Sequence, residues 1–131
     1  MLTNSGASLT IATLQMNGAS QYNTGSTLTN NGAITATGSI SNNMAMSAVN
    51  NGTLTFNGTA AQTLSGTSPY MAKNVTVNNA AGVTIGNPLM VNGTLTFTNG
   101  IITAVNTANA VIFTANGTGS VPNNASHVKD M

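Results

Sequence analysis

The sequence has almost no charge. Charged residues make up 2% of its 131 residues, against about 25% in ordinary soluble domains. They are Lys73, Lys129 and Asp130, and the chain has neither Arg nor Glu. Two lysines cannot form the basic surface that nucleic-acid binding requires. We therefore expect no nucleic-acid partner.

The residues of acid–base and metal chemistry are missing as well. Glycoside hydrolysis usually needs two carboxylates, and the chain carries one, Asp130. Cysteine is absent, so disulfides and thiolate metal sites are excluded, and one acid cannot build a calcium site. His127 and Lys129 lie beside Asp130 in what we interpret as a solvated tail. We expect a protein that is not an enzyme and has no cofactor or metal.

Long apolar runs are also lacking. No run approaches the roughly 20 residues that span a bilayer, and Met1–Thr10 has neither the basic region nor the apolar block of a signal peptide. The chain is nevertheless 40% hydrophobic with a net charge of +1, unlike disordered segments. A surface with so little charge lacks the repulsion that keeps proteins apart. We expect no membrane span, and we expect association with copies of the same chain.

What the sequence does contain is a repeat. The letters GTLTF occur at 52–56 and again at 93–97, which is two intervals of about 20 residues each. Alignment at this interval gives apolar pairs with one polar residue between their members, although the last pair follows its predecessor after a shorter interval than the others. The predicted core ladder consists of Leu14, Met16, Ile34, Leu54, Phe56, Val75, Val77, Leu95, Phe97, Val111 and Phe113.

The alternation within each pair is typical of a strand with one buried face. Asn74–Gly93 shows three short apolar clusters separated by Asn, Gly and Pro turn residues. We predict an all-β parallel β-helix (β-solenoid) with about 20 residues and three short strands per coil, and roughly six coils. Asn-Gly steps also suit hairpins, so an antiparallel β-meander or sandwich is the alternative. The prediction is one domain, 1–131, with its clearest repeats at 30–104 and a tail or junction at 119–131.

The polar residues between the buried ones are predicted to face outward as a row of threonines, because β-branched Thr suits exposed strand positions. Ordinary strand chemistry explains such a row, but several ice-binding solenoids also present flat rows of Thr. The predicted row consists of Thr35, Thr53, Thr55, Thr76, Thr94 and Thr96.

Two longer segments carry a resemblance. They are GTLTFNGTAAQTLSGTSPYMAKNVTVNNAAGVTIGNPLMVNGTLTFTNGIITA at Gly52–Ala104 and GSVPNNASHVKDM at Gly119–Met131. From Asn50 onward the chain resembles the low-complexity β-solenoid repeats of large secreted surface proteins of Bacteroidota. The resemblance implies export, often through the type IX system, and an extracellular or cell-surface adhesin or fibre. The C-terminal targeting domain that this system reads is not visible in the sequence.

These observations predict a structural protein. A solenoid end exposes unpaired backbone groups and an apolar cross-section unless it is capped, and neither end of the sequence shows a helical or charged cap. Head-to-tail contacts of such ends produce open filaments, which exchange of terminal strands can reinforce. We expect a self-assembling subunit of an extracellular filament or adhesin stalk. The alternatives are an ice- or glycan-binding solenoid that uses the Thr row, and a passive spacer repeat of a giant surface protein.

Overall fold

The chain is all-β, and its parallel sheets stack as a β-solenoid of about four turns. The computed structural model describes residues 2–4, 8–11, 14–16, 27–43, 45–46, 51–114, 116–120, 123 and 125–129. Side-chain burial is described for those of them from residue 29 onward, except 45–46. Among these residues the single helical element is a 3-10 turn, η1 (Thr107–Asn109).

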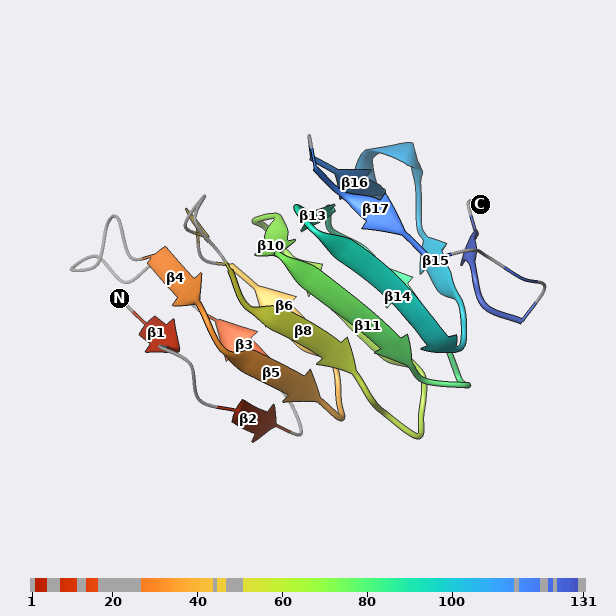
Figure 1. Cartoon of the computed structure of the whole chain (residues 1–131), viewed down its shortest axis with the longest axis horizontal. Coiled ribbons are helices and arrows are strands. Elements are labelled where there is room, and N and C mark those ends of the chain that lie inside the picture. Colours follow the sequence, from red (N-terminus) through yellow and green to blue (C-terminus); the bar gives the residue numbers. More distant parts are fainter. Residues whose placement is uncertain are drawn as a thin grey trace.

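Strands that are three elements apart along the chain lie side by side (Figure 1). The front sheet contains β2 (Ser8–Ile11), β5 (Ala33–Ala36), β8 (Thr53–Phe56), β11 (Asn74–Asn78), β14 (Thr94–Asn99) and β17 (Thr118–Gly119). The back sheet contains β3 (Leu14–Met16), β6 (Ile40–Asn42), β9 (Gln62–Gly66), β12 (Val83–Ile85), β15 (Ile102–Ala104) and β18 (Val128–Lys129). The side strands form two sheets, one of β1 (Leu2–Asn4), β4 (Thr27–Asn30) and β7 (Ala45–Met46), the other of β10 (Tyr70–Ala72), β13 (Leu89–Val91) and β16 (Val111–Phe113).

Every pairing between these strands is parallel. The antiparallel meander is therefore wrong for the described strands, and the isolated Asn123–Ser126 bridge is the one antiparallel contact among the described residues. The two GTLTF copies form β8 and β14, with β11 between them. The predicted size of a coil and the predicted number of coils stay predictions.

The core lies between the sheets and is built from columns of residues that point the same way. In the front sheet Ile34 pairs with Leu54, Leu54 with Val75, and Val75 with Leu95. Each of these side chains is buried, because alternate strand residues point to the same face. A second column of the same sheet contains Ala36, Phe56, Val77 and the partly buried Phe97.

The first apolar pair of the predicted ladder, Leu14 and Met16, does not belong to the front-sheet columns, so that part of the predicted alignment is wrong. Leu14 pairs with Ile40 and Met16 with Asn42 in the back sheet, whereas Leu9 occupies the front-sheet position beside Ile34. The interval from Leu9 to Ile34 is longer than the later intervals of the column. Counting back one regular interval from Ile34 therefore reaches the next strand along the chain. The burial of Leu14 and Met16 lies outside the described side chains.

The last apolar pair is also in a different column from the predicted one. Val111 and Phe113 belong to β16, which pairs with Leu89 and Val91 of β13. The front-sheet partner of Leu95 is Gly119. The pair arrives early in the repeat because it belongs to a side strand, which precedes the next front-sheet strand. Val111 is half-buried and Phe113 is exposed.

Buried amides hold the corners between front and back sheets. Gln62 donates from Nε2 to the carbonyl oxygens of Ala36 (3.0 Å) and Gly38 (2.6 Å). Its Oε1 accepts from the backbone N–H of Gly58 (3.0 Å) and from Nδ2 of Asn79 (2.9 Å). Gln62 and Asn79 are both 1% exposed, so these bonds satisfy polar groups that are shielded from water.

Candidate functional site

The front sheet presents the predicted threonines in register. Thr35 pairs with Thr55, Thr55 with Thr76, and Thr76 with Thr96, and Thr10 of β2 extends the same column beside Thr35. Thr35, Thr55 and Thr76 are half-buried, and Thr96 is exposed. We call Thr10, Thr35, Thr55, Thr76 and Thr96 the Thr column. Gln15, the residue between Leu14 and Met16 of the predicted ladder, does not belong to this column, because β3 lies in the back sheet.

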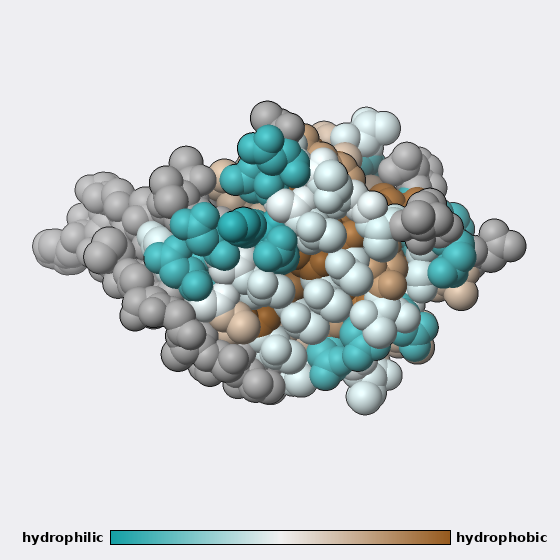
Figure 2. Space-filling model, viewed as in Figure 1, coloured by the Kyte–Doolittle hydropathy of each residue, from teal (hydrophilic) through white to brown (hydrophobic). Residues whose placement is uncertain are grey.

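The neighbouring outward column of the front sheet is less regular. Ala33 pairs with Thr53, Thr53 with Asn74, and Thr94 with Thr118. Thr53 and Thr94 therefore lie on the predicted face, but they are not direct neighbours. Figure 2 shows this side of the molecule as mainly pale surface with brown apolar patches between. Because strands lie about 4.8 Å apart, the hydroxyls of Thr35, Thr55, Thr76 and Thr96 recur at about that spacing.

A groove lies at the C-terminal end of the described strands. Its lining is mainly apolar, with a volume of about 280 Å³, and consists of Leu95, Phe97, Phe113, Gly119, Ser120, His127 and Val128. Phe113 is 41% exposed and Val128 is 38% exposed. We call these seven residues the end groove.

The end groove exists because the front-sheet column of core residues stops at a glycine. Gly119 lies beside Leu95, at the position where the preceding strands carry a branched apolar side chain. The ring of Phe113 extends over this position, and a Cβ atom on Gly119 would lie 3.4 Å from its Cζ. The missing side chain leaves the groove, and Phe113 forms one of its walls.

The strands around the end groove also have free edges. β16, β17 and β18 each pair with one preceding strand, and no strand in the described part of the chain pairs with their outer edges. A free parallel edge presents unpaired N–H and C=O groups to a further strand. Backbone groups and apolar side chains are thus exposed at the same end.

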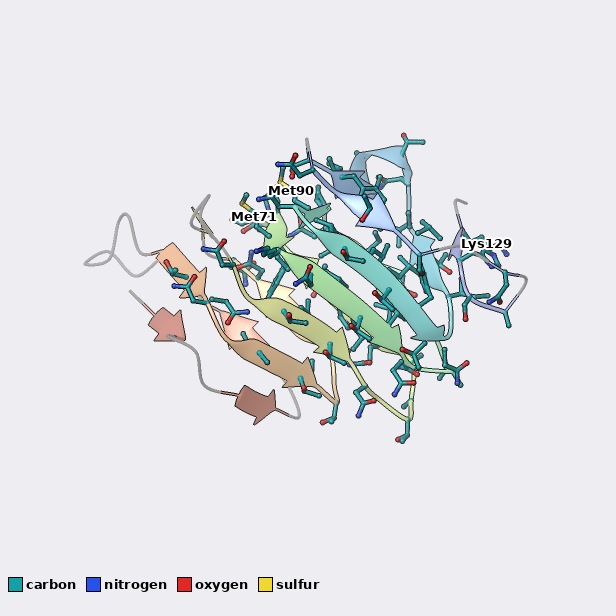
Figure 3. The ribbon with its side chains drawn as sticks, in the orientation of Figure 1. Met71, Met90 and Lys129 are labelled. Carbon is teal, nitrogen blue, oxygen red and sulfur yellow. The ribbon has the colours of Figure 1, made fainter. Side chains whose placement is uncertain are left out.

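The side strands carry an apolar outward row. Met71, Met90 and Ile112 are paired neighbours on β10, β13 and β16, and Figure 3 shows Met71 and Met90 close together, away from Lys129. The two methionines are half-buried, and Ile112 is exposed. This row adds apolar surface next to the free edge of β16.

The described residues hold little chemistry beyond these surfaces. Among them no three His, Cys, Asp or Glu side chains lie close enough to hold a metal ion, and no helix is long and apolar enough to cross a membrane. Tyr70 is fully buried, and its hydroxyl has no hydrogen-bond partner in the described region. Burial raises the pKa of the Tyr70 phenol well above its usual value, and this tyrosine cannot stack on a sugar at the surface. Tyr22, the other tyrosine of the chain, lies outside the described residues.

Comparison with known proteins adds no functional information, because no family model, curated protein or solved structure matches the chain.

Proposed function

We propose that the chain is a structural β-solenoid that assembles end to end with copies of itself, as a subunit of an extracellular filament or adhesin stalk. The single observation that carries this proposal is the coincidence of the end groove with the free edges of β16, β17 and β18. A docked coil pairs with those edges and covers the apolar wall of Phe113. Burying one such side chain stabilises an interface by about 1.5–3 kcal/mol, before the cost of association is subtracted.

The finer architecture belongs to the same proposal. Each coil comprises one side, one front and one back strand, about 20 residues in all, and six such coils form a rod. In this arrangement the N-terminal coil of one copy continues the strand columns of its neighbour. The contact is head to tail and open, so it extends into a filament. Exchange of the first or last residues between copies reinforces the joint.

The setting rests on the resemblance of Gly52–Ala104 to repeats of secreted Bacteroidota surface proteins. We propose export to the cell surface, with no enzymatic activity. A passive spacer role is the closest variant of this proposal, because the next repeat of a longer chain would cover the end groove equally well. Adding the flanking repeats to the chain would then abolish self-association, whereas a filament subunit would keep it.

A matched pair of substitutions tests the end contact. Val128 lines the end groove and is 38% exposed, whereas Val105 is 39% exposed and lies outside it. A glutamate at Val128 places an unpaired charge against an apolar surface, so Val128→Glu should shift sedimentation from polymers to monomers. Val105→Glu adds the same charge and should leave polymers intact. Equal dissociation by both variants would show that charge alone, and not the end groove, controls assembly.

The Thr column supports a second candidate function, the binding of ice or glycan. This function is favoured by the in-register placement of Thr35, Thr55, Thr76 and Thr96. Their hydroxyls make no hydrogen bond to the described part of the protein and are therefore available to a ligand. Double substitution of Thr55 and Thr76 by Tyr should abolish thermal hysteresis or glycan retention while filaments persist. Retained binding in that variant would refute this candidate.

A further inference from the structure

The chain contains seven Asn-Gly steps, and the described glycines among them differ in the hydrogen bonding and burial of their N–H groups. In such a step the backbone nitrogen of Gly can attack the side-chain amide carbon of Asn, provided that this nitrogen first loses its proton to solvent base. A hydrogen bond from the Gly N–H to an acceptor within the fold opposes that loss. The identity of the acceptor at each glycine therefore decides which asparagine reacts.

Four of the described steps have an engaged glycine. The N–H of Gly52 donates to the carbonyl oxygen of Asn30 (2.8 Å), and that of Gly117 to the carbonyl oxygen of Thr114 (2.8 Å). Gly58 donates to Oε1 of Gln62 (3.0 Å) in a buried corner. The fourth, Gly32, donates to the side chain of Asn30 at 3.2 Å.

Gly93 and Gly100 differ from these four, because neither N–H has a hydrogen-bond partner among the described residues. Gly100 is buried and adopts a φ of 95°, and its burial keeps solvent base away from its nitrogen. Gly93 is half-buried and follows the exposed Asn92. Of the described steps, Asn92–Gly93 alone combines an exposed Asn with a glycine whose N–H is unengaged and which is not fully buried.

A second contact favours the same step. The hydroxyl of Thr114 donates to Oδ1 of Asn92 at 2.8 Å. Negative charge develops on this oxygen when the Gly93 nitrogen adds to Cγ, and a donor already in place stabilises it. Thr114 lies just after β16, so the contact depends on the fold and is absent from the unfolded chain.

We propose that Asn92 is the preferred site of spontaneous deamidation in the folded protein. The Gly93 nitrogen forms a bond to Cγ of Asn92, the Cγ–Nδ2 bond breaks, and ammonia leaves with the proton that the Gly93 nitrogen has lost. Solvent water then opens the succinimide ring at one of its two carbonyl carbons. The products are aspartate and isoaspartate, and each adds one negative charge to a chain whose formal net charge is +1.

The isoaspartate product changes the geometry of the chain. It inserts an extra backbone atom between β13 and β14, immediately before Gly93. The carbonyl oxygen of Gly93 accepts the N–H of Thr118 at 2.7 Å, and this bond helps hold β17 against β14. Conversion of Asn92 therefore loosens a wall of the end groove. The effect of this change on assembly rests on the proposed function, whereas the deamidation reaction does not.

Peptide mapping with isoaspartate-resolving mass spectrometry tests the proposal. The folded wild-type chain is incubated at mildly alkaline pH, and conversion is followed at each described Asn-Gly step. Conversion at Asn92 should lead Asn51 and Asn57 by about fivefold or more, the factor expected for the release of one ordinary hydrogen bond. In guanidinium chloride the three rates should become equal.

Two variants keep the test sharp. Thr114→Val removes the hydroxyl and nearly preserves the shape, and should slow conversion at Asn92 by about fivefold while the rate at Asn57 stays unchanged. Asn92→Gln should remove the leading site and leave the other rates as they were. Equal conversion of Asn51, Asn57 and Asn92 in the folded chain would overturn the proposal, and faster conversion in Thr114→Val would overturn the role assigned to Thr114.

Discussion

Gln62 offers the most demanding test of how the coils are joined. Its amide contacts Ala36 and Gly38 in one coil and Asn79 in another, and it also accepts the N–H of Gly58. Replacement by leucine keeps a similar volume but removes both donors and the acceptor. The perturbation is therefore confined to the hydrogen bonds of one buried corner.

The magnitude follows from which partners have a second bond. The carbonyl oxygen of Ala36 also accepts the N–H of Asn57 (2.9 Å), and Nδ2 of Asn79 also donates to the carbonyl oxygen of Ala60 (2.9 Å). The carbonyl oxygen of Gly38 and the N–H of Gly58 lose their described partner. The buried N–H of Gly58 costs about 1–3 kcal/mol when it is left unsatisfied. The carbonyl oxygen of the half-buried Gly38 costs less because water can reach it, so Gln62→Leu should lower the free energy of unfolding by about 1–4 kcal/mol.

Urea unfolding followed by circular dichroism measures this change. Thr63 is the exposed neighbour of Gln62 on β9, and Thr63→Val provides the control, with an expected change within about 0.5 kcal/mol. If Gln62→Leu also stayed within that range, the buried amides would not hold the corner. The stacking of coils through their polar corners would then be refuted.

Three further predictions concern stability. Gly100→Ala should cost about 3 kcal/mol or more in unfolding free energy, because φ is 95° and the new Cβ would clash with the carbonyl oxygen of Asn79. Gly86→Ala should be nearly neutral, because its Cβ would make an ordinary 3.7 Å contact with the carbonyl oxygen of Leu64. Equal effects of the two variants in urea melts would contradict this prediction. Leu54→Ala should cost about 2–5 kcal/mol by the same assay, since Leu54 is fully buried, and a change below about 1 kcal/mol would argue against the core column. Burial raises the pKa of Tyr70 in the folded state, so the native chain holds the phenolic proton more tightly than the unfolded chain does. The stability that this proton contributes is complete below about pH 10 and is lost as the pH rises further. Tyr70→Phe should therefore reduce the fall in unfolding free energy at alkaline pH. A fall between about pH 8 and pH 11 that is the same in Tyr70→Phe and in the wild-type chain would contradict the raised pKa of Tyr70.

The middle of the fold could be predicted from the sequence because the repeat is most regular there. A nearly constant step of about 20 residues connects Ile34, Leu54, Val75 and Leu95, and a period of two identifies their buried face. These two regularities are sufficient to align β5, β8, β11 and β14. They also align Thr35, Thr55, Thr76 and Thr96, because residues between buried positions must point the other way.

The ends could not be predicted because the interval between paired strands changes. Leu9 rather than Leu14 lies beside Ile34, and Gly119 rather than Val111 lies beside Leu95. An apolar pair in a side strand has the same local pattern as one in the front sheet, so periodicity cannot distinguish them. The end groove could not be predicted for the same reason, because it depends on Gly119 lying beside Leu95 in the front-sheet column.

The polar corners were missed for a different reason. Gln62 and Asn79 are polar residues within a chain rich in Asn, Thr and Ser, and nothing local indicates that they are buried. Their partners across the coils are 17 or more residues away along the chain. Only the stacking of strands brings these groups together.

The proposed filament requires strands to stack from one copy of the chain to the next. Negative-stain electron microscopy of the purified wild-type chain through serial dilution tests this requirement most directly. Stacking between copies predicts uniform, unbranched filaments that survive dilution and are lost in Val128→Glu. Discrete single particles of the wild-type chain at every concentration would contradict it.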